Sequence, residues 1–153
     1  MSVAFRREGD EEHLEPKYEL PIPPGPNLVT ARGAAQIAAR VAELETVLAG
    51  LSDEEERKKA HRVLRYWRNR QATAQIAPVS DGEAVAFGTT VTFRLNGKLQ
   101  TLTIVGHDEA DPAAGLISFA APLVRAMMEA EPGEALPFGG RPDALEVLSI
   151  TPG

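Results

Sequence analysis

Residues 31–51, ARGAAQIAARVAELETVLAGL, carry a regular stripe of apolar side chains at spacings of 4, 3, 4 and 3. This is the heptad pattern of a helix that packs against a second helix. Thr30 can cap the start of this helix, and Gly50 can end it in the left-handed conformation. The stripe consists of Ile37, Val41, Leu44, Leu48 and Leu51.

A second helix is predicted directly after the first. Ser52 and Glu55 form the S-x-x-E pattern of a capping box, and Pro78 stops the helix. Two such helices joined by a turn of two or three residues fold back antiparallel. We therefore predict a coiled-coil helical hairpin over residues 29–77, with the alternative that both helices pack on the sheet that follows. The predicted seam contains Ile37, Val41, Leu44, Leu48, Leu64 and Trp67, and the second stripe also includes Ala60, Gln71 and Ala74.

The C-terminal half changes to the period of β-strands. Residues 84–94 and 99–105 flank Asn96-Gly97, a strong signal for a tight hairpin turn. A short strand over 115–119, a helix over 123–130 and strands over 135–138 and 144–150 follow. This order predicts an α+β domain over residues 80–153, an antiparallel sheet with one helix.

The N-terminal segment, residues 1–28, is predicted to be an extended or disordered tether. It begins with a charged run and then carries five prolines between positions 16 and 26. Proline removes a backbone donor and steers the residue before it away from helix. The segment has no apolar region typical of a signal peptide, and no apolar run of about 18 residues exists in the chain. We therefore expect a cytoplasmic protein with no membrane contact.

Residue patterns typical of enzyme active sites are sparse in this sequence. The chain has no cysteine, and its three histidines lie in different segments without metal-ligand spacing. No phosphate-binding loop or nucleophile-elbow motif is present. Residues 77–153 carry ten acidic against four basic residues, which argues against general DNA or RNA binding. We also predict no direct sequence-specific contact with nucleic acid. We predict no catalytic residue and no intrinsic cofactor.

Two acidic clusters remain as candidate sites. Asp53, Glu54, Glu55 and Glu56 lie at the turn of the predicted hairpin. Asp53 and Glu56, three residues apart, could share a Mg²⁺ ion with a site on another protein. The alternative is that these acids only complement the helix dipole. Asp108, Glu109 and Asp111 form the second cluster, which we interpret as a solvated turn.

Four motifs in the C-terminal half resemble the C-terminal domain of the bacterial Gre transcript-cleavage factors. They read VAFGTTV (85–91), IVGHDEAD (104–111), GLIS (115–118) and PLVRA (122–126). Residues 28–33 also resemble the family's entry into its coiled coil, and 74–76 its exit. The resemblance covers about residues 27–150 and leaves the tether outside.

The resemblance implies an accessory factor of RNA polymerase that acts during transcription elongation. The family's FKBP-like domain docks at the rim of the polymerase secondary channel, and its coiled coil enters that channel. Acidic tip residues, here Asp53, Glu54 and Glu56, then help to hold Mg²⁺ in the polymerase active site, so the polymerase is the enzyme. The chain is expected to be a monomer. The residues expected to contact polymerase are Ser118, Ala120, Ala121, Pro122 and Arg125.

The sequence departs from the Gre pattern in three places. Ala120 replaces a polar residue, Gly133-Glu134 replaces Gly-Asp, and each hairpin arm is shorter by roughly two or three turns of about 5.4 Å. The short hairpin is similar to that of Rnk-type relatives, which are linked to regulation of nucleoside diphosphate kinase. The alternative is therefore an Rnk-like regulator, or a competitor at the polymerase rim. On the Gre reading we predict weak or absent cleavage stimulation.

Overall fold

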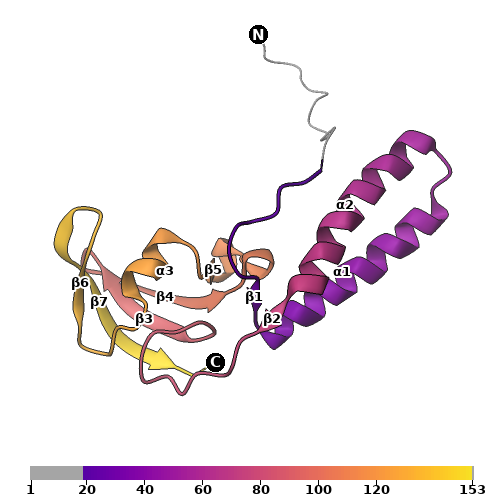
Figure 1. Ribbon diagram of the computed structural model, residues 1–153. Coiled ribbons are helices and arrows are strands. Elements are labelled where there is room, and N and C mark those ends of the chain that lie inside the picture. Colours follow the sequence, from indigo (N-terminus) through magenta and orange to yellow (C-terminus); the bar gives the residue numbers. More distant parts are fainter. Residues whose placement is uncertain (1–18, 153) are drawn as a thin grey trace, which may run out of the picture. The chain divides into compact units, whose positions relative to one another are not determined.

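The computed structural model describes residues 19–152 (Figure 1). These residues divide into two compact units, and each is described by itself. The first comprises residues 19–25 and 37–73, and the second comprises 26–36 and 74–152. The first 18 residues of the predicted tether lie outside the described residues, and 19–27 contain neither helix nor strand. No helix in 19–152 combines the length and the apolar character that crossing a membrane requires.

Two helices of equal length build the hairpin. α1 spans Ala31–Gly50 and α2 spans Glu54–Thr73, each 20 residues or about 30 Å long. They lie side by side and are joined by a short turn (Figure 1). Val41, Leu44 and Leu64 form the buried centre of the seam, and Leu48, Val63 and Trp67 pack against it. This confirms the predicted seam for every member except Ile37, which is buried but lies outside this cluster.

At the helix ends, one predicted cap is confirmed and two predictions are wrong. Thr30 caps α1 as predicted, because its hydroxyl oxygen accepts the Gly33 N–H at 2.9 Å. Gly50 does not adopt the left-handed conformation; it is the last residue of α1. The predicted cap of α2 is wrong by one residue, since the Asp53 carboxylate, rather than the Ser52 hydroxyl, accepts an N–H, that of Glu56 at 3.0 Å.

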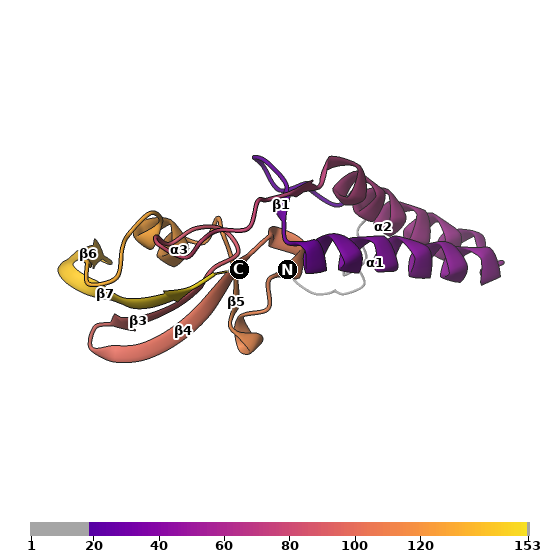
Figure 2. The same ribbon diagram turned by 90° about the horizontal axis from the view of Figure 1, so that it is seen from below.

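The second unit is built on a five-stranded sheet with the order β5-β4-β3-β7-β6. Neighbouring strands are antiparallel except β4 and β5, which are parallel. A second sheet pairs β1 with β2 in parallel. One helix, α3 (Pro122–Met127), covers one face of the large sheet (Figure 2). The strands are β1 (Leu28–Val29), β2 (Gln75–Ile76), β3 (Thr90–Leu95), β4 (Lys98–Val105), β5 (Leu116–Ser118), β6 (Ala135–Phe138) and β7 (Arg141–Thr151).

The core of this unit confirms the α+β class. Alternate residues of β3, β4 and β7, the inner face of α3 and Val85 supply its fully buried members. Asn96 and Gly97 form the predicted hairpin turn, with φ of 53° and 83°. The buried core cluster consists of Val85, Val91, Phe93, Leu102, Ile104, Val124, Met127, Ala130, Leu145 and Val147.

Three details of the second unit differ from the prediction. The strand predicted over 84–94 begins only at Thr90, because Gly88 has a φ of 89° and the Thr89 hydroxyl bonds the Ala86 carbonyl at 2.7 Å, which makes a turn. The helix predicted to reach residue 130 ends at Met127, and Glu129 has a φ of 69°. β5 is parallel to β4 because two 3₁₀ turns, His107–Glu109 and Pro112–Ala114, carry the chain back before it pairs.

Candidate functional site

The turn of the hairpin presents four consecutive acids. Asp53, Glu54, Glu55 and Glu56 are all exposed, and the last three form the first turn of α2. One oxygen of Asp53 accepts the Glu56 N–H at 3.0 Å, so this carboxylate caps the helix. The position of these acids at the start of α2 therefore agrees with the alternative that they stabilise the helix N-terminus.

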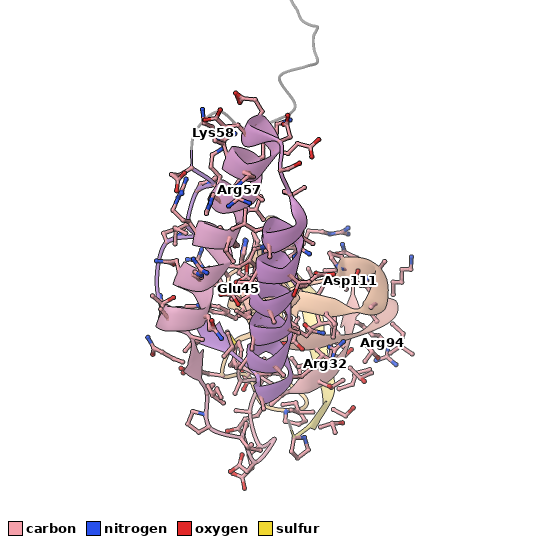
Figure 3. The ribbon with its side chains drawn as sticks, turned by 90° about the vertical axis from the view of Figure 1, so that its right-hand side faces the viewer. Arg32, Glu45, Arg57, Lys58, Arg94 and Asp111 are labelled. Atoms are coloured by element: carbon pink, nitrogen blue, oxygen red, sulfur yellow. The ribbon has the colours of Figure 1, made fainter. Side chains whose placement is uncertain are left out.

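Arg57 of α2 links the two helices at the turn of the hairpin. Its Nη1 donates to the carbonyl oxygens of Leu48 and Leu51, at 2.9 Å each. Leu48 lies in the last turn of α1 and Leu51 follows the helix, so neither carbonyl has an α-helical partner four residues on. Arg57 thus satisfies backbone carbonyls at the end of α1, where we predicted that a left-handed Gly50 would end the helix. Figure 3 shows Arg57 and Lys58 at this end of the hairpin.

The stretch expected to bind a partner, residues 118–125, is divided between core and surface. Phe119, Ala121 and Leu123 pack against the core, and the Phe119 ring meets that of Phe87 edge to face at 5.6 Å. The half-buried Ser118 uses its hydroxyl oxygen to accept the Ala120 N–H at 3.1 Å, which fixes the turn into α3. The side chains left exposed are Ala120, Pro122 and Arg125.

Glu109 is a structural residue that the sequence analysis missed. We predicted a solvated turn around it, but its side chain is only 4% exposed. It accepts hydrogen bonds from the Thr30 hydroxyl at 2.5 Å and from Arg32 Nη1 at 3.0 Å. The two partners lie 79 and 77 positions away. No local pattern could have revealed this cluster, which anchors the first turn of α1 within the second unit.

Residues 80–152 match the family described as "Transcription elongation factor, GreA/GreB, C-term". Residues 80–152 are thus similar to the C-terminal domain of the GreA/GreB factors, and we call them the Gre domain. The match confirms the resemblance inferred from the four motifs at 85–126. It includes the stretch 118–125, whereas the tip acids at 53–56 lie outside it.

Individual Gre factors show the same likeness. The chain is 44% identical over 58 residues to transcription elongation factor GreA of Thermomicrobium roseum, which covers 38% of this chain and 37% of the relative. It is 37% identical over 75 residues to GreA of Desulfovibrio desulfuricans, covering 46% of each chain. The matches thus span less than half the length of these two relatives. The solved GreA/GreB factor of Nitrosomonas europaea aligns over 84% of this chain and 99% of its own, with 19% identity and a TM-score of 0.39.

The family match therefore applies to the Gre domain and not to the hairpin tip. The exposed residues Ala120, Pro122 and Arg125 belong to the matched Gre domain. At the tip, Asp53 and Glu56 offer carboxylate oxygens three residues apart, a donor type that Mg²⁺ accepts. Within 19–152, no group of three His, Asp or Glu side chains is placed to hold a metal ion.

Proposed function

We propose that this chain is a transcription elongation factor that binds RNA polymerase at the rim of its secondary channel. The observation that carries the proposal is the match of residues 80–152 to the GreA/GreB C-terminal domain. In this reading the chain acts in the cytoplasm as a monomer. It is not itself an enzyme, because the polymerase supplies the catalytic site.

The contact surface proposed for polymerase lies around the start of α3. Pro122 and Arg125 are exposed, and Ala120 precedes them in the turn that Ser118 fixes. Ala121 is half-buried and contributes mainly to the core. Arg is enriched at protein interfaces, and a rigid turn loses little conformational entropy on binding, so this turn suits a protein partner.

The hairpin is proposed to enter the secondary channel with its acidic tip leading. If the tip reached the polymerase active site, Asp53 and Glu56 would lend carboxylate oxygens to a Mg²⁺ ion there, with Glu54 beside them. Such an ion stabilises negative charge on phosphate oxygens during cleavage of RNA. The chain's own contribution would be to place two exposed carboxylates, one of which also caps α2.

Hairpin length limits this role. An arm that is two or three turns short leaves the tip roughly 10–16 Å from the position that a full-length Gre hairpin reaches. Bonds to Mg²⁺ are about 2.0–2.1 Å, so a displacement of even a few ångströms prevents coordination. We therefore propose that the chain occupies the channel and stimulates transcript cleavage weakly or not at all.

The test uses purified bacterial RNA polymerase stalled in a backtracked complex. Binding of the chain is measured by co-migration with the complex, and cleavage by shortening of the labelled RNA. We expect binding without marked shortening. Shortening that is strong with the wild type and lost in Asp53→Ala/Glu56→Ala would show that the hairpin is long enough. Absence of binding would overturn the proposal and favour the alternative, an Rnk-like regulator of nucleoside diphosphate kinase.

A further inference from the structure

The second unit carries an apolar groove that takes no part in the proposed polymerase contact. Its walls are the start of α1 (residues 30–32), the run 76–80 that begins at the end of β2, and residues 87–88. All of them belong to the second unit, and none lies in the stretch 118–125. The groove has a volume of about 280 Å³, which suits one or two side chains of a partner rather than a cofactor.

Two large apolar side chains of this groove are open to solvent. Val79 is 78% exposed, the highest value among the large apolar side chains of 19–152, and Ile76 is 62% exposed. Residues of these two types are among those most often buried in folded proteins. Apolar groups that gather in one hollow mark a binding surface, because covering them is favoured by the apolar area that leaves water.

β2 has an open edge next to this groove. Within 19–152 it pairs only with β1. Gln75 donates its N–H to the Asn27 carbonyl at 2.9 Å, and Ala77 donates its N–H to the Val29 carbonyl at 3.1 Å. Successive residues of a strand direct their N–H and C=O groups to opposite sides, so those of Ile76 point away from β1. An extended peptide can therefore add to this edge through main-chain hydrogen bonds.

Arg32 places a positive charge at one wall of the groove. Its Nη1 donates to the Glu109 carboxylate at 3.0 Å, which holds the side chain in place. The Arg32 side chain is 61% exposed and that of Glu109 only 4%, so the cation is the accessible member of the pair. No other hydrogen bond or ion pair within 19–152 engages the guanidinium group of Arg32. Its remaining N–H donors suit a second carboxylate.

We propose that this groove binds an extended segment of a partner protein that carries a carboxylate two residues away from an apolar side chain. In an extended strand these two side chains face the same side, about 6–7 Å apart. The carboxylate pairs with Arg32, the apolar side chain enters the groove beside Val79, and the backbone of the segment adds to the open edge of β2. The inference does not depend on RNA polymerase.

The first experiment adds a synthetic peptide, Thr-Asp-Val-Leu-Val-Thr with blocked ends, to the intact chain. We expect amide chemical-shift changes in an NMR titration to centre on residues 30–32, 76–80 and 87–88. Hydrogen exchange at the Ile76 amide should slow, because this group gains a partner. A control peptide with Lys in place of Asp should bind about tenfold more weakly at low salt. Equal binding of the two peptides, or shifts that leave out residues 76–80, overturns the proposal.

The second experiment changes the groove. Val79→Ser removes an exposed apolar side chain, so we expect the peptide to bind about tenfold more weakly while the melting temperature stays unchanged. Leu99→Ser is the matched control, because Leu99 is 62% exposed in the same unit and lies outside the groove. It should bind the peptide like the wild type. Equal peptide affinities of the two variants overturn the proposal.

RNA polymerase serves as the comparison partner in the same pair of variants. Val79→Ser should bind polymerase like the wild type, because the groove contains no residue of the stretch 118–125. A loss of polymerase binding in Val79→Ser alone would assign the groove to the polymerase contact and overturn a separate partner. The peptide titrations decide the proposal even if the chain binds no polymerase, so its failure is distinct from failure of the proposed function.

Discussion

The Thr30 hydroxyl donates a 2.5 Å hydrogen bond to the carboxylate of Glu109, a side chain that is 4% exposed. The same hydroxyl oxygen accepts the Gly33 N–H at 2.9 Å, so one threonine both caps α1 and partners a buried acid. A buried carboxylate is tolerated only when it is paired and hydrogen-bonded, and Arg32 supplies the charge at 3.0 Å. The entry into α1 is therefore fixed by a residue of the Gre domain.

The first prediction concerns Gly33, which is buried in the first turn of α1. A Cβ at this position would lie 2.7 Å from Glu109 Oε1 and 3.4 Å from Thr30 Oγ1. Replacing an exposed helical Gly by Ala usually stabilises by up to about 1 kcal/mol. Here we expect Gly33→Ala to destabilise by about 1–3 kcal/mol, because the added methyl group displaces the buried carboxylate from its partners. Urea denaturation followed by far-UV circular dichroism measures the change.

The same helix offers a matched control. Gly50 is the last residue of α1, it is exposed, and a Cβ there would meet nothing within 4 Å. Gly50→Ala should leave the free energy of unfolding unchanged or raise it slightly. If both variants behave alike, the crowding around Glu109 is not what makes glycine necessary at position 33.

The second prediction concerns the seam of the hairpin. Leu64 is 1% exposed and contacts the buried centre formed with Val41 and Leu44. We expect Leu64→Ala to cost about 2–5 kcal/mol, since it removes buried methyl groups and leaves a cavity. Trp67 is the sole tryptophan and packs against this cluster, so its fluorescence reports unfolding of the hairpin. Val47→Ala is the control: Val47 lies on the same helix pair but is 48% exposed, and a midpoint shift as large as that of Leu64→Ala would contradict the register.

Hairpin and sheet were predictable because their signals are local. The heptad spacing of Val41, Leu44 and Leu48 and the Asn96-Gly97 turn are visible within a few residues of sequence. The cap of α2 was misplaced by one residue because Ser52 and Asp53 both suit that position, and only the backbone decides between them. Glu109 could not be predicted at all, because its burial depends on partners brought from the other end of the chain.

The third prediction concerns pH. The hydrogen bonds from Arg65 lower the pKa of Glu19 from its ordinary value of 4.5. A carboxylate whose pKa is lowered by an ion pair stabilises the bound segment fully at any pH above the ordinary pKa. The contact is lost as the pH falls through the lowered pKa. We therefore expect Glu19 to titrate below pH 4.5 by NMR, with residues 20–22 leaving α2 over the same range. In Arg65→Gln the pKa of Glu19 should return to its ordinary value; an unchanged titration would show that another group is responsible.

The last prediction concerns docking through the Gre domain. Pro122 is exposed at the first position of α3, where an acidic residue is tolerated because it faces the positive end of the helix. Pro122→Asp should therefore leave the melting temperature nearly unchanged while it places a charge in the proposed polymerase contact. We expect the affinity for RNA polymerase to fall by about tenfold or more, which corresponds to about 1.4 kcal/mol. Pro112 provides the matched control, because it is also exposed and also begins a short helical turn of the same domain, outside the stretch 118–125. Pro112→Asp should bind polymerase like the wild type. Equal affinities of the two variants, each with an unchanged melt, would place the polymerase contact elsewhere on the Gre domain.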